Sequence, residues 1–525
     1  MTSVFLLLIH LIISVQSINV LVYSPAFAAS HTNFMARLAD TLTEAGHNVT
    51  FLVPIIDVAR RNQLGVRVTT DIVVVEQDES KDHVPFDESM EAYWAEHTDS
   101  SNIQESFKWF IDAMILGCDN FLKHADVFNE MRNRNFDVAI VEPLSICGLG
   151  FAKALGIEKT ILASSCAHYD MIFQYIGEPD EHSYLPALVS LKGEKMDFAE
   201  RYENYRVAEG LRIVFTEMFD EEQKTVAKYL GENIKNWRDL FPDASLFFTN
   251  SNPYVDFPRP VLQKTIPIGG ISVNMEHLRS RKLDDHWNEL LDKRKLNMLI
   301  SFGSMVQSAQ LPEESRRNLL NVIRSEPNVT FIWKYETNET SFADGVRNIH
   351  FSKWVPQAAL LGDTRLTAFL THGGLGSTNE LAHCGKPAVM VPIFGDQHRN
   401  SHMLERHGGV VVVSKHSLGE WDVVKRAVHS VLYDKKYTMN AIRLSEILQN
   451  QPTKPKEQVV KYTEFVARYG PFPQMDPFGR KLNFFQRLLL DVYLIEALIY
   501  LFCFFIFTYI CVFQLPKLLV KRIRN

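Results

Sequence analysis

The chain has 525 residues, of which 46% are hydrophobic and 22% are charged. At roughly 150 residues per domain, this length predicts two to four domains. The composition excludes a disordered chain, a coiled coil and a small disulfide scaffold, because it supplies a large apolar core. The formal net charge of −7 argues against nucleic acid as the main partner.

The N-terminus begins with a short apolar run. Residues 4–13 read VFLLLIHLII, and the small residue Ser17 follows. The run is too short to span a bilayer, so the pattern predicts a secretory signal peptide over residues 1–17. The first residues lack Lys and Arg, and the alternative is a buried first strand.

The C-terminus carries a longer apolar segment. Residues 497–515 contain no charged residue, and a helix of that length rises roughly 28 Å, close to the thickness of a bilayer core. We therefore predict a transmembrane helix over residues 494–515, after a juxtamembrane segment over residues 471–493. A buried core helix is the alternative.

Residues 516–525 form a basic tail that contains Lys517, Lys521, Arg522 and Arg524. The positive-inside rule places such a tail in the cytosol, so the sequence predicts a single-pass type I protein with lumenal domains. Lys521 and Arg522 resemble a basic retrieval signal. This resemblance favours the endoplasmic reticulum or another secretory-pathway membrane.

The chain has six cysteines, two of them in the apolar C-terminal segment. None stands in a metal-binding spacing, so we expect no metal site. Disulfide pairing stays open among the other four, which are Cys118, Cys147, Cys166 and Cys384. Three N-x-[ST] sequons are predicted glycosylation sites in a lumenal protein, and their asparagines are Asn48, Asn328 and Asn338.

The first half of the chain alternates buried strands with amphipathic helices. The apolar runs predict strands over residues 18–24, 49–53, 136–141 and 159–163. Phe34, Leu38 and Leu42 repeat every four residues, as one face of a helix does, and a second helix is predicted over residues 149–155. This β-α-β order favours a parallel sheet covered on both faces, and we assign it to an N-terminal domain over residues 18–250.

A second alternating series follows. It predicts strands over residues 297–301, 329–333, 366–370, 388–392 and 409–413, and a helix over residues 312–324. We assign residues 296–470 to a C-terminal domain, and residues 251–295 to a proline-containing linker. The expected fold class is α/β, with two Rossmann-like, doubly wound domains that face each other across a cleft. Ligands bind such sheets beyond the carboxyl ends of the strands.

Several familiar motifs for nucleotides and nucleophiles are missing. Residues 25–31, after the first strand, contain no glycine, which argues against a dinucleotide-binding turn. No G-x-x-x-x-G-K-[ST], G-x-S-x-G or D-x-D pattern occurs either. The sequence therefore gives no support to a dehydrogenase or to a nucleotide held through a metal ion.

The most informative segment lies in the second half. Residues 371–380 read THGGLGSTNE between a predicted strand and a predicted helix. Glycines let backbone amides approach a ligand, and a helix N-terminus favours an anion. His372 can donate a hydrogen bond to a phosphate, and Glu380 can accept hydrogen bonds from a ribose. A glycine-rich turn without function would be the alternative if this segment stood alone.

Two further motifs flank this segment. Residues 354–357 read WVPQ, and residues 395–397 read GDQ. The composite resembles the signature of the UDP-glycosyltransferase family, and in particular its membrane-anchored animal branch, the UDP-glucuronosyltransferases. The resemblance extends to the two hydrophobic ends. It implies a GT-B fold, with an acceptor-binding N-terminal domain, a UDP-sugar-binding C-terminal domain and no cofactor.

The resemblance also implies roles for single residues. The uracil and ribose would be held by Trp354, Gln357 and Glu380; the diphosphate by Ser304, His372, Gly374 and Ser377; and the transferred sugar by Asp396 and Gln397. Gly376, next to Ser377, departs from the family, in which many members have Asn.

The family places its catalytic base just after the first strand, where this chain has His31. A neutral imidazole can accept the proton of an acceptor hydroxyl. The base needs an acidic partner, which is an aspartate in the family, and Glu142 holds that place here. The alternative for Glu142 is a solvated carboxylate at the end of a strand.

The reaction that follows from the resemblance is an inverting transfer of a sugar, expected to be glucuronic acid, to a hydroxyl or amine of a small lipophilic acceptor. We expect the acceptor pocket within residues 84–205, which are rich in Phe, Trp, Tyr and Met. The alternatives are a UDP-glucosyltransferase and an inactive glycoside-binding protein. A homo-oligomer is possible, and no nucleic-acid partner is expected.

Overall fold

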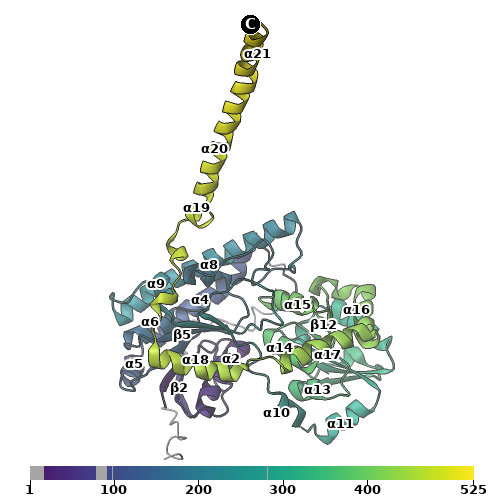
Figure 1. The fold of residues 1–525 in the computed structure, drawn as a ribbon. Helices are drawn as coiled ribbons and strands as arrows, with labels where there is room; N and C mark the ends of the chain where they lie inside the picture. The colour runs from purple at the N-terminus through teal and green to yellow at the C-terminus, as the bar shows by residue number, and fades with distance from the viewer. Residues whose placement is uncertain (1–16, 78–91, 97–98, 281, 525) are drawn as a thin grey trace, which may run out of the picture.

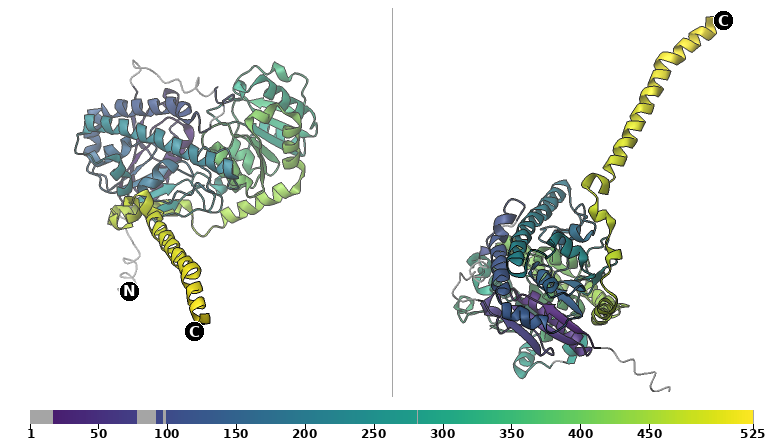
Figure 2. Two further views of the ribbon diagram at one scale, coloured as in Figure 1. Left: turned by 90° about the horizontal axis from the view of Figure 1, so that it is seen from above. Right: turned by 90° about the vertical axis from the view of Figure 1, so that its left-hand side faces the viewer.

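The computed structural model describes residues 17–77, 92–96, 99–280 and 282–524. Within this part of the chain, two parallel β-sheets lie side by side, each with helices packed on it (Figure 1). A long helix at the C-terminus leaves the body and stands clear of it in every view (Figure 2). The predicted signal peptide lies almost entirely outside the described residues.

The first sheet has seven parallel strands in the order β3-β2-β1-β4-β5-β6-β7. The strands are β1 (Asn19–Tyr23), β2 (Asn48–Pro54), β3 (Asp71–Val75), β4 (Val138–Val141), β5 (Thr160–Ser164), β6 (Leu246–Thr249) and β7 (Thr265–Pro267). Every residue of β4 and β5 is buried, as expected for central strands of a sheet covered on both faces. The four strands predicted for this half are confirmed.

The helices of this half are α2 (Ala29–Glu44), α4 (Ile103–Leu122), α5 (Ala125–Arg132), α6 (Cys147–Ala154), α7 (Asp170–Ile176), α8 (Phe198–Leu230) and α9 (Trp237–Asp243). Phe34, Leu38 and Leu42 of α2 are buried, which confirms the predicted apolar face. The long helix α8 begins with a capping box between Asp197 and Glu200 and packs along α4.

The second sheet has six parallel strands in the order β10-β9-β8-β11-β12-β13. The strands are β8 (Leu296–Ser301), β9 (Val329–Lys334), β10 (Ile349–Ser352), β11 (Ala368–Thr371), β12 (Ala388–Met390) and β13 (Val410–Val412). All five strands predicted for this half are present.

The helices that follow the first sheet are α10 (Met275–Ser280), α11 (Asp285–Asp292), α12 (Glu313–Arg324), α13 (Gln357–Gly362), α14 (Leu375–Cys384), α15 (Gln397–Glu405), α16 (Trp421–Tyr433), α17 (Lys435–Gln449) and α18 (Pro455–Tyr469). The predicted helix over residues 312–324 corresponds to α12. Its hydrophobic residues Leu319, Leu320 and Ile323 are buried on one side.

The structure differs from the expected linker over residues 251–295. β7 pairs with β6 and completes the first sheet, and α11 buries Trp287 and Leu291 in the second half. Parallel pairing with a buried neighbour stabilises β7 although its segment lacks a strand pattern. The expected domain ending at residue 470 also differs, because α18 crosses back to the first half and packs on α2.

The C-terminal helix is the one helix of the described residues that is long and apolar enough to cross a membrane. It runs from Leu490 to Arg524 through α20 (Leu490–Tyr509), a π-helical turn and α21 (Leu515–Arg524), after the short helix α19 (Phe484–Arg487). None of it is buried against the body. Its start at Leu490 is close to the predicted start at residue 494, and the basic tail continues the helix.

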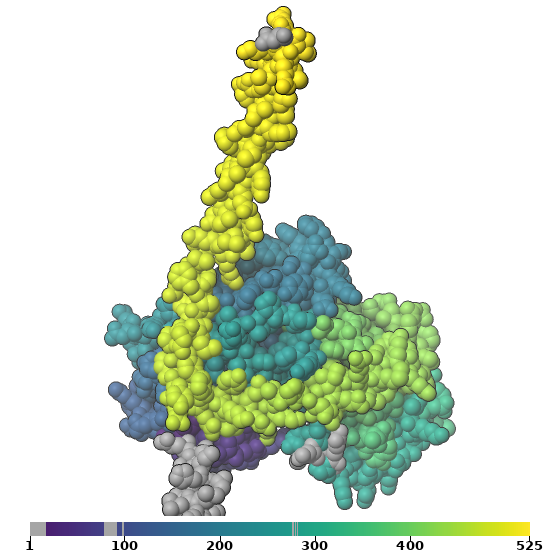
Figure 3. Space-filling model, in the orientation of Figure 1, coloured from purple at the N-terminus to yellow at the C-terminus, as the bar shows by residue number. Residues whose placement is uncertain are grey.

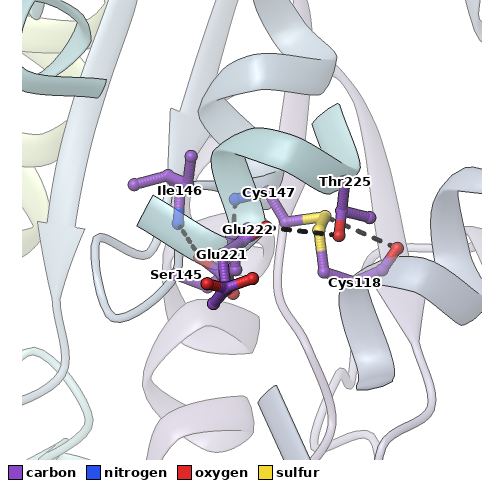
Figure 4. Close-up of a disulfide and its surroundings, with 7 residues drawn as sticks. All are labelled: Cys118, Ser145, Ile146, Cys147, Glu221, Glu222 and Thr225. Atoms are coloured by element: carbon purple, nitrogen blue, oxygen red, sulfur yellow. Dashed lines mark hydrogen bonds between the residues drawn. A yellow bond between two sulfur atoms is a disulfide. The ribbon is translucent and has the colours of Figure 1, made fainter. Parts of the chain in front are cut away.

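A disulfide joins Cys118 of α4 to Cys147 of α6 (Figure 4). The segment that precedes Cys147 is also held by α8, because the fully buried Glu222 accepts hydrogen bonds from Ser145 Oγ at 2.6 Å and from the Ile146 amide at 2.8 Å. Both restraints act on the loop that starts at Glu142, directly after β4.

Candidate active site

A cavity of about 360 Å³ lies between the two sheets and is lined by residues from both halves. In the first sheet, the neighbouring strands β1, β4 and β5 point their carboxyl ends toward it. In the second sheet, β8, β11 and β12 do the same. The loops after these strands therefore meet in one place, as expected for doubly wound sheets.

His31 and Glu142 meet at this cavity. His31 lies in the first turn of α2, and its Nδ1 is 2.6 Å from Oε1 of Glu142, which has no exposed surface. Ser165, directly after β5, joins them: its Oγ is 2.6 Å from Nδ1 of His31 and donates a hydrogen bond to Oε1 of Glu142. The ring of Phe27 packs against the imidazole. These contacts fix the orientation of His31.

The charges around His31 raise its pKa. Burial lowers the pKa of His31, but the charge and hydrogen bond of Glu142 and the charge of Asp396 raise it, and the net result lies above the ordinary value of 6.5. A carboxylate that accepts from Nδ1 selects the tautomer with the proton on Nδ1. Nε2 is then the nitrogen that can accept a proton.

His372 follows β11 and is enclosed by two glycines. A Cβ atom at Gly303 or at Gly374 would lie 2.6 Å from the imidazole, so a larger residue at either position would displace the ring from its place. Burial, together with the charge of Lys334, lowers the pKa of His372 to about 4. The imidazole is therefore neutral at pH 7, and its buried Nδ1 has no hydrogen-bond partner among the residues that the structure describes.

Three polar side chains near the start of α14 form a connected group. Nε2 of Gln357, the first residue of α13, donates to Oγ of Ser377 at 3.0 Å and to Oε2 of Glu380 at 2.8 Å. All three line the cavity. They present hydroxyl, amide and carboxylate groups next to the glycine-rich turn.

Asp396 and Gln397 stand at the start of α15. Gln397 accepts hydrogen bonds from the amides of Ile393 and Phe394, and this fixes the loop that carries Asp396. Burial raises the pKa of Asp396, against the opposing effects of Asn400 and His31.

The fully buried Arg399 anchors α15 to the first half of the chain. Its guanidinium lies 2.8 Å from Oδ1 of Asp256, and its Nε donates to the carbonyl of Pro186 at 3.2 Å. The loop with Asp396 is therefore held by contacts from both halves.

Comparison with known proteins identifies the family. A family model described as UDP-glucoronosyl and UDP-glucosyl transferase matches residues 19–525. The chain belongs to the UDP-glycosyltransferase family. It is therefore an enzyme that transfers a sugar from a UDP-sugar to an acceptor.

Two curated relatives align over almost the whole chain. The ugt-47 protein of Caenorhabditis briggsae is 28% identical over 513 residues, which cover 96% of this chain and 94% of the relative. UDP-glucuronosyltransferase 1A8 of Rattus norvegicus is 26% identical over 465 residues, which cover 88% of this chain and 86% of the rat protein.

Solved structures with the same fold confirm the predicted GT-B architecture. A UDP-glucosyltransferase from Polygonum tinctorium matches with a TM-score of 0.58 and 14% identity, over 87% of this chain and 100% of that chain. A UDP-glucose:anthocyanidin 3-O-glucosyltransferase in complex with UDP also gives a TM-score of 0.58, with 15% identity, over 86% of this chain and 99% of that chain.

Most of the residues selected from the sequence of this UDP-glycosyltransferase line the cavity: His31, Ser304, Gln357, His372, Gly374, Ser377, Glu380, Asp396 and Gln397. Glu142 lies behind His31. Trp354 does not line the cavity and is 68% exposed. The three sequon asparagines Asn48, Asn328 and Asn338 are exposed on the body, and their glycosylation stays a prediction.

Two features of the site were not predicted from the sequence. Ser165 contacts both His31 and Glu142, and its only signal in the sequence was its position two residues after the predicted strand over residues 159–163. The apolar wall of the cavity includes Phe27 and Phe215, which lie outside the range expected for the acceptor pocket. Within that range, Phe107, Phe110 and Leu188 line the cavity as expected, and residues 84–91, 97 and 98 lie outside the described part of the chain.

Proposed function

We propose that this UDP-glycosyltransferase transfers glucuronic acid, with inversion, to a hydroxyl or amine of a small lipophilic acceptor. The observation that carries the proposal is the hydrogen-bonded pair of His31 and Glu142, which faces Asp396 and the glycine-rich turn across one cavity. The pair comes from one half of the chain and the turn from the other. A base and a nucleotide site on opposite walls can hold an acceptor and a donor at the same time.

In the proposed reaction, Nε2 of His31 accepts the proton of the acceptor hydroxyl or amine. The acceptor atom attacks the anomeric carbon of the sugar, and the bond from that carbon to the UDP oxygen breaks. UDP leaves with the electron pair of this bond, from the face opposite the attack. Glu142 stabilises the imidazolium that forms, because its carboxylate lies 2.6 Å from Nδ1.

The donor would be held by the second half of the chain. The neutral imidazole of His372 is able to donate a hydrogen bond to the diphosphate, beside the amides of the glycine-rich turn. We assign Ser304, Gly374 and Ser377 to the same diphosphate. Glu380 is assigned to the ribose, Trp354 and Gln357 to the uracil and ribose, and Asp396 and Gln397 to the sugar hydroxyls. Trp354 does not line the cavity, so its assignment rests on the family resemblance alone.

The donor assignment follows the relatives. The curated rat relative is named a UDP-glucuronosyltransferase, and it supports glucuronic acid as the transferred sugar. The structural relatives with glucosyltransferase titles support UDP-glucose as the alternative. We also propose that no metal ion takes part. One group of the described residues has metal-binding geometry, and its members, Asp170, Asp180 and His182, do not line the cavity.

The acceptor assignment rests on the apolar side of the cavity. Phe27, Phe107, Phe110, Leu188 and Phe215 line it, and the ring of Phe27 packs against His31. Aromatic and aliphatic walls favour lipophilic molecules that present one polar group to the base. The acceptor class is therefore a small lipophilic alcohol, phenol or amine.

The proposed location is the endoplasmic reticulum or another secretory-pathway membrane, with the body in the lumen. The apolar helix Leu490–Arg524 supplies the span, and the basic tail after it would face the cytosol. The disulfide Cys118–Cys147 supports an oxidising compartment.

One assay tests the proposal. Membranes that contain the full-length protein are incubated in EDTA with a panel of phenols and either UDP-glucuronate or UDP-glucose, and the products are identified by mass and by the anomeric configuration. We expect a β-glucuronide. If a β-glucoside is the sole product, the donor is UDP-glucose instead of UDP-glucuronate, and the proposed mechanism stands. UDP-sugar binding without a product from any acceptor would contradict the proposed reaction and favour an inactive binding protein.

A further inference from the structure

The first turns of α8 carry a row of exposed aromatic side chains. Phe198, Tyr202 and Tyr205 are 77%, 59% and 48% exposed. Their spacing of four and three residues places them on one face of the helix. On the other face, Asn204, Val207 and Leu211 are buried against the body. We call Phe198, Tyr202 and Tyr205 the aromatic row.

The aromatic row lies at the end of α8 that points the same way as the C-terminal helix. In Figure 1, the end of α8 away from α9 rises above the rest of the body, to the level at which α19 leads into α20. The view turned by 90° shows the same arrangement (Figure 2). In the space-filling view, this end of the body reaches the height at which the C-terminal helix leaves the body (Figure 3).

The chemistry of the row fits the interfacial layer of a bilayer. Phenylalanine and tyrosine at the surface of a helix insert among lipid headgroups, since their rings are apolar and the tyrosine hydroxyl stays hydrated. Charges of both signs flank the row, as shown by the salt bridge between Lys192 and Glu200. Mixed charges match a zwitterionic headgroup better than a strongly anionic one.

We infer that the aromatic row is a second membrane contact, which inserts into the zwitterionic interface of the same bilayer that the C-terminal helix spans. The inference goes beyond the proposed reaction and rests on the assignment of Leu490–Arg524 as a span. An isolated span allows the body to rotate and tilt, whereas two contacts fix its orientation. The acceptor side of the cavity is then held toward the membrane, because α8 contributes Phe215 and α4 contributes Phe107 to the cavity wall.

The test uses the full-length protein in phosphatidylcholine nanodiscs that contain a phosphatidylcholine with a photoactivatable acyl chain. After irradiation and proteolysis, mass spectrometry locates the lipid adducts. We expect adducts on peptides with residues 198–205 and on peptides from the span. The internal control is α18, where Phe465 and Tyr469 are 48% and 56% exposed but lie away from the side from which α20 leaves.

A variant with Phe198→Ser and Tyr202→Ser removes the most exposed part of the row and leaves Tyr205, whose ring contacts His182. We expect adducts on residues 198–205 to be lost while adducts on the span and the melting temperature remain unchanged. The control variant combines Trp421→Ser and Met439→Ser, which are 46% and 62% exposed on α16 and α17, and should keep all adducts.

Two results would overturn the inference: adducts on the span with none on residues 198–205, or adducts on α18 as frequent as those on α8. An unlabelled span would instead contradict the assignment of Leu490–Arg524. This failure is distinct from that of the proposed reaction, which is measured by product formation.

Discussion

Replacing Glu142 by glutamine separates the electrostatic role of this residue from its role in packing. Glutamine keeps the shape and still accepts a hydrogen bond from Nδ1 of His31, but it removes the charge. In the native site, that charge and hydrogen bond oppose the effect of burial and raise the pKa of His31. The variant therefore tests whether Glu142 acts through the base.

The size of the effect follows from the distance of 2.6 Å between Nδ1 of His31 and Oε1 of Glu142. Two unit charges at that separation attract each other by about 6 kcal/mol at an effective dielectric constant of about 20. The net effect is smaller, because a hydrogen bond to a charged carboxylate, which contributes about 1.5–3 kcal/mol, is replaced by a weaker one to a neutral amide. We expect kcat to fall by about 10–150-fold.

The pH profile of kcat/KM gives the more specific readout. His31 must be neutral to accept a proton, so activity rises as pH rises through its pKa. The raised pKa places this acid limb above pH 6.5 in the native enzyme. Glu142→Gln removes the charge that raises the pKa of His31, so burial lowers this pKa. The acid limb then moves to lower pH, and the maximal rate is reduced.

The matched control is Ser165→Ala, which removes a hydrogen bond to Glu142 but leaves its charge. This variant should lose less activity and keep its acid limb near the native position. If Glu142→Gln lowers kcat and leaves the acid limb unchanged, Glu142 does not act through His31 and the reasoning is refuted.

Three further substitutions test other parts of the structure. Asp396→Ala should lower kcat/KM about 10–150-fold, for a lost charged hydrogen bond, while calorimetry shows unchanged UDP affinity; weaker UDP binding would reassign Asp396 to the nucleotide. His372→Ala should instead weaken UDP binding by a similar factor, and unchanged affinity would remove His372 from the diphosphate site. Burial raises the pKa of Glu222 from 4.5 to about 8, so native stability should fall as pH rises between these values, because the unfolded carboxyl loses its proton first. Glu222→Gln should then be more stable than the native protein at pH 8, by a few kcal/mol in order of magnitude; equal melting temperatures across this pH range would show that Glu222 is ionised in the folded state.

The sequence predicted the parts of the fold that have a local pattern. The central strands β1, β4, β8 and β11 are apolar runs, because both faces of a parallel sheet are buried. β7 was not recognised, since three residues that end in Pro267 carry no strand pattern and depend on pairing with β6. The packing of α18 on the first half could not be predicted either, because the helical period of a segment does not specify which sheet the helix covers.

In the site, too, residues with a local signal could be predicted, whereas contacts between distant segments could not. His31 and Glu142 are 111 positions apart, and they were paired by the family resemblance, which places the base just after the first strand and its acidic partner at the end of a later strand. Ser165 has an equally favourable place, but serine is common in loops and its contacts with the pair are set only by the folded sheet. The exposed face of α8 was missed because its spacing becomes informative only when the buried face of the helix is known.

The most direct test of the account is the dependence of the His31→Ala defect on the acidity of the acceptor. If Nε2 of His31 takes the proton, an alcohol of ordinary pKa should react about 10²–10⁴-fold more slowly with the variant, the usual contribution of a general base. Acidic phenols are already partly ionised, so the defect should shrink steadily as the pKa of the acceptor falls, while UDP affinity stays unchanged. A variant that transfers sugar to a high-pKa alcohol at the native rate would contradict the assignment of His31 as the base.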